Sequence, residues 1–263
     1  MRAHVAVNNG KLAETVAGAS HAAEHYESIG HRRFACEARV NLGVTLLELG
    51  QLEEAEACIR QVLATSQKLD LKYLFGGTLQ ALTNILAYRG SFVEARATGL
   101  QAVAVSSAQN DRRFQGYAEA YLSVTEYLAG DYERAEQYAS ASAGTLADVP
   151  TTRPFALALL ARSLLPQGRR AEALLNARDA YAELERMGLV DDGDATIRLA
   201  LVECLIATGD RLAASDVLDK ATRRILAAAE TIDDPAIRQS FLTRIPEHRR
   251  ILELARELAG SNS

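Results

Sequence analysis

The stretch from Asn41 to Ala57, NLGVTLLELGQLEEAEA, decides the fold of this chain. It has the pattern of one amphipathic helix ending, a turn led by a glycine, and a second helix beginning. The same pattern recurs along the chain at steps of 40, 40, 40, 38 and 41 residues, around Gly10, Gly50, Gly90, Gly130, Gly168 and Gly209. A period of this length indicates an array of two-helix repeats.

Two further positions repeat with the last five of these glycines. Eight residues before each glycine stands a leucine: Leu42, Leu82, Leu122, Leu160 and Leu201. Five residues after each glycine stands an alanine: Ala55, Ala95, Ala135, Ala173 and Ala214. A single helical hairpin cannot bury its apolar face alone, so successive hairpins stack and each repeated residue meets equivalent neighbours. The sequence therefore predicts an all-α solenoid of antiparallel helix hairpins.

The residues Leu42, Gly43, Leu46, Gly50, Ala55 and Ile59 resemble the signature of the tetratricopeptide repeat. The resemblance covers about residues 1–232 and implies a right-handed superhelix whose first helices line a concave groove. Arrays of this family bind partners of many kinds, so the resemblance specifies the fold more closely than the activity.

The repeat units are expected as hairpins of helices of about 18 residues. Residues 1–9 are read as the end of an earlier helix, and the missing start favours a chain that continues a longer protein. Pro166 is expected to disturb the last turn of its helix. The predicted pairs are 31–50 with 51–69, 71–89 with 91–109, 112–129 with 131–147, 152–167 with 169–187, and 194–208 with 210–232.

Residues 233–263 are predicted to form a C-terminal cap of two helices, 235–244 and 246–259, and a short tail. We expect one face of this cap to pack on the last repeat and its charged face to lie in water. The segment also resembles the closing part of repeat arrays in large bacterial signalling proteins, where the array accompanies a kinase, a cyclase, a signalling ATPase or a DNA-binding domain.

Composition fits a helical protein and excludes several other classes. The 263 residues include five Pro and no Trp, with a net charge of −5 and no basic arm for nucleic acid. No apolar run is long enough to cross a membrane, and no signal peptide is present. Cys36, Cys58 and Cys204 are far apart and in helical contexts, which indicates reduced thiols and a cytoplasmic protein.

One stretch matches a catalytic motif. His21, Glu24 and His25 spell H-x-x-E-H, the signature of inverted zinc peptidases, in which both His share a metal. The array supplies no evident third ligand, so a solvated helix face is the preferred interpretation. A zinc-dependent hydrolase is kept as the minor alternative; otherwise the sequence predicts no enzyme and no cofactor.

Basic residues begin the first helices of three successive repeats. Arg32, Arg33, Lys72, Arg112 and Arg113 are expected along one edge of the stack, where a basic edge could bind acidic groups. Simple solubilisation of that edge is the preferred interpretation.

Alignment to the resembled family places a set of first-helix side chains in the concave groove. Tyr suits such a groove because it offers wide contact area and a hydroxyl at small entropic cost. Tyr132, by contrast, matches Leu52 and Phe92 and is expected in the core. The predicted groove residues are Val44, Gln80, Asn84, Tyr88, Tyr117, Tyr127, Arg162, Arg198 and Glu203.

These residues predict a protein–protein interaction or scaffold module. It would bind a peptide, a protein or another domain of its parent chain, as the regulatory segment of a bacterial signalling protein. The main alternative is a domain that senses a ligand or signal peptide. A clamp for chaperone tails does not fit, because Asn84 alone matches the residues that such clamps use. The sequence leaves the partner and the oligomeric state open.

Overall fold

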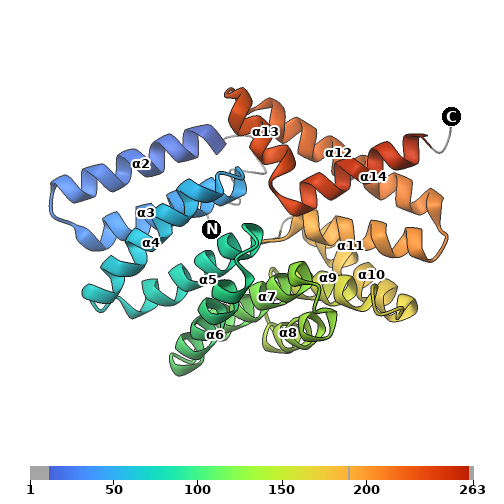
Figure 1. The fold of residues 1–263 in the computed structure, drawn as a ribbon, viewed down its shortest axis with the longest axis horizontal. Coiled ribbons are helices and arrows are strands. Elements are labelled where there is room, and N and C mark those ends of the chain that lie inside the picture. The colour runs from blue at the N-terminus through green and yellow to red at the C-terminus, as the bar shows by residue number, and fades with distance from the viewer. Residues whose placement is uncertain (1–11, 189, 261–263) are drawn as a thin grey trace.

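The structure is a computed structural model that describes residues 12–188 and 190–260. Within these residues thirteen helices, α2 to α14, form an all-α solenoid (Figure 1). Gly10 and the expected first half-helix 1–9 lie outside the described residues. No helix in the described part is long and apolar enough to cross a membrane.

The expected hairpins are confirmed, and one outer helix precedes them. That helix is α2 (Leu12–Ser28). The five hairpins are α3 (Arg32–Glu48) with α4 (Leu52–Lys68), α5 (Lys72–Tyr88) with α6 (Phe92–Ala108), α7 (Arg112–Ala129) with α8 (Tyr132–Thr145), α9 (Arg153–Leu164) with α10 (Arg170–Met187), and α11 (Asp194–Ala207) with α12 (Arg211–Glu230). The helix α9 ends at Leu164, two residues before Pro166, as expected from the missing amide and the ring of proline.

The first helix of each hairpin belongs to an inner layer. In sequence order these helices contact one another: α3 with α5, α5 with α7, α7 with α9, and α9 with α11. The second helices pack on the outside of this row. Figure 1 shows the row curving, so that the first repeats and the C-terminal helices approach each other. The inner helices therefore carry any residue that faces the hollow of the solenoid.

The residues that repeat along the chain pack between neighbouring helices. Ala55, Ala95, Ala135, Ala173 and Ala214 are all fully buried. Leu82, Leu122 and Leu201 are buried, and Leu42 and Leu160 are half-buried. The small alanine at each site lets two helix backbones approach, and this geometry is copied from one hairpin to the next.

Turns at both ends of the hairpins adopt the left-handed conformation. The sequence identified the glycines inside the hairpins, but the turns between hairpins use the same backbone geometry. Over the regular part, residues with positive φ recur every 20 positions: Gly30, Gly50, Asp70, Gly90, Asn110 and Gly130. The sequence did not predict the turns at Asp70 and Asn110. Aspartate and asparagine can adopt a positive φ, but they do so less often than glycine and are therefore a weaker turn signal.

The C-terminal segment consists of α13 (Pro235–Thr243) and α14 (Pro246–Gly260), close to the expected bounds. Asp234 caps α13 by accepting from the amides of Ala236 and Ile237. One face packs on α11 and α12 as expected. The other face does not lie wholly in water, because Arg244 reaches the first hairpin and Glu247 reaches the inner helices.

Contact between the two ends of the solenoid is built around Gly50. A Cβ atom added to Gly50 would stand 2.6 Å from the carbonyl oxygen of Ser240 in α13. The neighbouring Leu49 is buried in the same apolar cluster as Phe241, Ile251 and residues of α9 to α12. The segment α13–α14 therefore bridges the first hairpin and the last.

Candidate functional site

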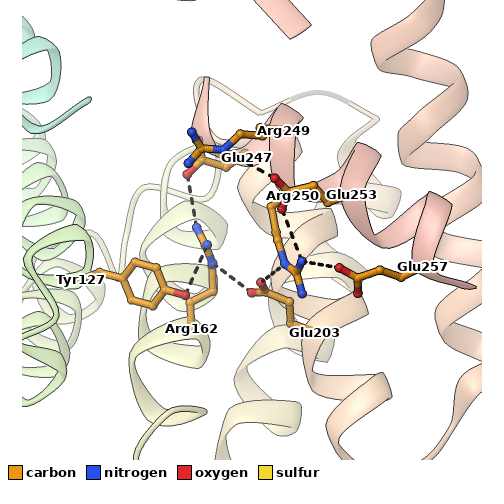
Figure 2. Close-up of polar contacts among 8 residues, drawn as sticks. All are labelled: Tyr127, Arg162, Glu203, Glu247, Arg249, Arg250, Glu253 and Glu257. Carbon is orange, nitrogen blue, oxygen red and sulfur yellow. Dashed lines mark hydrogen bonds and ion pairs between the residues drawn. The ribbon is translucent and has the colours of Figure 1, made fainter. Parts of the chain in front are cut away.

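The inner face of the solenoid carries a buried polar cluster centred on Arg162. Figure 2 shows Arg162 in α9 between Glu203 in α11, Glu247 in α14 and Tyr127 in α7. The guanidinium lies 3.2 Å from a carboxylate oxygen of each glutamate. It also lies over the Tyr127 ring, 4.5 Å from the centroid, and donates to the Tyr127 hydroxyl at 3.4 Å. Three helices thus converge on a cation of a fourth.

The electrostatics of Arg162 follow from this arrangement. Burial of the side chain opposes its charge, but Glu203, Tyr127 and Glu247 outweigh that effect and raise the pKa of Arg162. A buried cation of this kind is tolerated because its partners also satisfy its hydrogen bonds. Removing one partner would leave the others incompletely paired in a place that water reaches poorly.

Both oxygens of the Glu247 carboxylate are used. The Tyr88 hydroxyl at the end of α5 donates to Oε2 at 2.9 Å, and Arg162 donates to Oε1 at 3.2 Å. Glu247 is 4% exposed. Burial and the nearby Glu247 carboxylate raise the pKa of Tyr88 well above its usual value, so this hydroxyl stays a proton donor.

A second set of acids reaches the inner face from the loop between α10 and α11. Asp192 accepts a hydrogen bond from the Tyr121 hydroxyl at 2.5 Å. Asp191 pairs with Arg113 at 2.7 Å and accepts from the Thr151 hydroxyl at 2.8 Å. Gly193 allows this approach, since a Cβ there would stand 2.2 Å from the Phe155 ring. The loop therefore covers the inner face beside α7.

The nine predicted groove residues fall into three groups. Tyr88, Arg162 and Glu203 join Tyr127 in the cluster around Glu247. Three others make contacts within or between helices: Gln80 donates to the carbonyl of Phe114 in α7, Arg198 pairs with Asp194 of its own helix and Glu185 of α10, and Tyr117 stacks on Tyr121 of its own helix. Val44 and Asn84 remain half-buried on α3 and α5.

Asn84 retains unused bonding capacity. Its Oδ1 atom is buried and has no hydrogen-bond donor among the described residues. An acceptor in this state costs free energy unless a further group reaches it. The atom is closed to solvent, so a bound molecule would reach it only after the Asn84 side chain turned.

Sequence reasoning missed Glu247, Arg244 and the two loop aspartates. A signal for Glu247 was present, because positions 247, 251, 254 and 258 lie on one face of a helix. An acid at the head of an otherwise apolar stripe indicates a buried polar contact. Nothing local marked Asp191 or Asp192, since their partners lie 39 to 78 positions away in sequence.

The other sequence candidates lie outside this cluster. His21, Glu24 and His25 are exposed on α2. No group of three or more His, Cys, Asp or Glu side chains in residues 12–188 and 190–260 is arranged to hold a metal ion. Of the basic edge, Arg33 pairs with Glu37 and Arg113 with Asp191, whereas Arg32 and Lys72 are exposed.

The expectation that Tyr132 lies in the core is wrong. Its side chain is 37% exposed and its ring meets the Tyr127 ring edge-on at 5.6 Å. Tyr132 also lines a shallow, open pocket with Gly130, Asp131 and Gln167, at the turn between α7 and α8. A ring at the first position of a helix can lean outward over the turn, whereas the Leu52 side chain at that position is buried.

Comparison with known proteins agrees with this architecture. Residues 37–68 match the tetratricopeptide repeat. The chain resembles this family over those residues, and its fold is that of a tetratricopeptide-repeat solenoid. No curated protein matches it in a sequence search.

Several solved structures share the tetratricopeptide-repeat fold with this chain at low identity. BtubC (BKLC) from P. vanneervenii is 19% identical, with a TM-score of 0.62 over 85% of this chain and 94% of that one. A Rap protein complexed with Competence and Sporulation Factor is 15% identical, with a TM-score of 0.68 over 97% and 74%. The signal-transduction ATPase PH0952 from Pyrococcus horikoshii, which has a tetratricopeptide-repeat sensor, is 15% identical, with a TM-score of 0.55 over 84% and 37%.

Proposed function

We propose that this tetratricopeptide-repeat chain is a protein-interaction module that binds a peptide or protein partner on its inner face. The observation that carries the proposal is the convergence of Tyr88, Tyr127, Arg162 and Glu203 from four successive inner helices on one place. Aromatic and arginine side chains in a desolvated hollow are typical anchors of protein recognition. The chain already uses them to hold a helix.

The experiment selects a ligand first and then removes groove contacts. Twelve-residue peptides are selected from a random displayed library against the full chain, and their affinity is measured by fluorescence anisotropy. The double variant Val44→Ala, Asn84→Ala changes two half-buried inner positions, whereas the polar contacts of Glu247 are with Tyr88 and Arg162. We expect it to weaken binding about tenfold, which equals about 1.4 kcal/mol.

The matched control truncates two exposed apolar residues, Val93 of α6 and Leu175 of α10. Val93→Ala, Leu175→Ala is expected to bind the selected peptide as the unchanged chain does. Equal affinity of the groove variant and the unchanged chain would contradict binding on the inner face.

We further propose that the module regulates a larger bacterial signalling protein in the cytoplasm. The Rap structure with its bound factor and the sensor of the Pyrococcus ATPase concern those proteins, but they make a regulatory use of this fold reasonable here. Deleting these residues from a full-length parent should change its enzymatic or DNA-binding output. An unchanged output combined with loss of partner binding would indicate a docking scaffold instead.

A ligand-sensing domain is the second candidate, and the bridge between the two ends of the solenoid favours it. A ligand that displaces α13–α14 would also change the curvature of the array. Small-angle scattering with and without the selected peptide distinguishes a sensor from a passive scaffold. The radius of gyration of a sensor changes when the peptide binds, and that of a passive scaffold does not.

A further inference from the structure

The segment α13–α14 occupies the inner face in the way a bound ligand would. Glu247 brings the carboxylate that Arg162 and Tyr88 bind. Ile251 and Leu254, one and two turns later, are buried in the apolar cluster with α11 and α12. Three features of this helix are thus recognised: an acid in its first turn, which the inner face binds, and aliphatic residues four and seven positions later, which pack on the last hairpin.

Charge complementarity explains why the first of these features must be acidic. Without Glu247, Arg162 retains Glu203 as its carboxylate partner. The buried guanidinium would then keep one of the two carboxylates that it contacts in the folded chain. A second acid restores the balance, and the Tyr88 hydroxyl supplies a donor for its other oxygen.

The occupant is held at its far end by an exposed contact. Arg244 donates two hydrogen bonds to Glu53, at 2.6 and 2.7 Å, and both side chains are more than a third exposed. We name this ion pair the clasp. Exposed pairs are weak, so the clasp can be altered without disturbing the core.

We propose that the inner face recognises an amphipathic helix with an acidic residue in its first turn, and that α13–α14 is an intramolecular competitor held in place by the clasp. The inference rests on the proposed binding function and names the chemistry of the partner. A tethered segment competes at an effective concentration in the millimolar range, so an external helix gains access when the tethered segment is weakened.

The probe is a fluorescein-labelled synthetic peptide of residues 234–260, added to the full-length chain. In the unchanged chain the resident segment blocks the site. Arg244→Glu replaces the ion pair by like charges beside Glu53, and we expect about fivefold tighter binding of the peptide. The charge-swapped chain Glu53→Arg, Arg244→Glu restores an ion pair and is expected to return binding to the low level.

A second chain variant tests the acid without touching the clasp. Glu247→Gln in the full-length chain weakens the resident segment at Arg162, and we expect tighter binding of the unchanged peptide. The same substitution in the peptide should weaken its binding to Arg244→Glu at least tenfold. Hydrogen exchange over residues 235–260 measures release of the resident segment in each variant.

Three results would overturn the proposal. Equal binding of the unchanged and Glu247→Gln peptides would mean that the acid is not recognised. Released α13–α14 without peptide binding would mean that the site does not take a helix in trans. Unchanged exchange in Arg244→Glu would mean that the clasp does not hold the competitor. Because the probe comes from this chain, these results are independent of whether library peptides bind at Val44 and Asn84.

Discussion

Arg244 in α13 and Glu53 in α4 form a doubly hydrogen-bonded ion pair across 191 positions of sequence. The hydrogen bonds from Arg244 hold the pKa of Glu53 down at about 2. Beside this pair, the backbone of Ser240 passes close to Gly50. These contacts turn a linear stack of repeats into one whose first hairpin touches its C-terminal cap.

Gly50 and Gly90 offer a matched pair for testing this contact. Both have positive φ, but a Cβ would meet α13 at Gly50 and nothing within 4 Å at Gly90. Gly90→Ala should cost only the left-handed strain, about 1–2 kcal/mol. Gly50→Ala should cost more and should increase hydrogen exchange in residues 235–260. Equal unfolding free energies in urea and equal exchange would show that α13 does not depend on Gly50.

Loss of the buried cation should be costly. Arg162→Met removes the partner of Glu203 and Glu247 and is expected to lower the unfolding free energy by about 3–5 kcal/mol. Lys220→Met breaks the exposed pair with Asp216 and should change it by less than about 1 kcal/mol. Urea denaturation of both variants makes the comparison. A similar small loss in both would mean that water reaches Arg162 freely.

His248 gives the cap a dependence on pH. Its Nδ1 lies 2.9 Å from the carbonyl oxygen of Phe241 and donates to it in the neutral ring. Burial lowers the pKa of His248 below its usual 6.5, and the hydrogen bond to Phe241 and the acids Glu247 and Asp194 oppose this shift only in part. The unfolded chain then binds the proton more readily, so stability is lost as the pH falls below 6.5 and the loss ends below the folded pKa.

The measurement is urea denaturation between pH 7.5 and 5. His248→Gln retains a donor for Phe241 but cannot titrate, so its stability should fall less over this range. Identical pH profiles for the two chains would exclude His248 as the cause.

Substitutions in the turns between hairpins should stabilise the folded chain. Asp70 and Asn110 have φ of 51° and 54°, in the region that favours glycine. Asn110→Gly should raise the unfolding free energy by up to about 1 kcal/mol, because strain in the folded state is removed. Ala104→Gly, at an exposed site inside α6, should instead lower it by about 1 kcal/mol. Thermal denaturation distinguishes the two signs, and a lower midpoint for Asn110→Gly would contradict the reading of that turn.

Much of this protein was determined by its sequence. The 40-residue period, the turn glycines and the repeated alanines fixed an array of antiparallel hairpins, because each feature acts between residues close in sequence or between identical neighbouring copies. The break at Pro166 followed for the same reason. Four of the residues assigned to the groove, Tyr88, Tyr127, Arg162 and Glu203, do lie together.

Only the tertiary structure decided what fills the hollow and how the ends meet. The curvature of the stack accumulates over five hairpins, and small differences in packing at each step set where the last one arrives. The partners Glu53 and Arg244, or Arg162 and Glu247, are therefore brought together by a sum of rotations that no single repeat encodes. Local pattern determines each hairpin, and the accumulated geometry determines which distant charges meet.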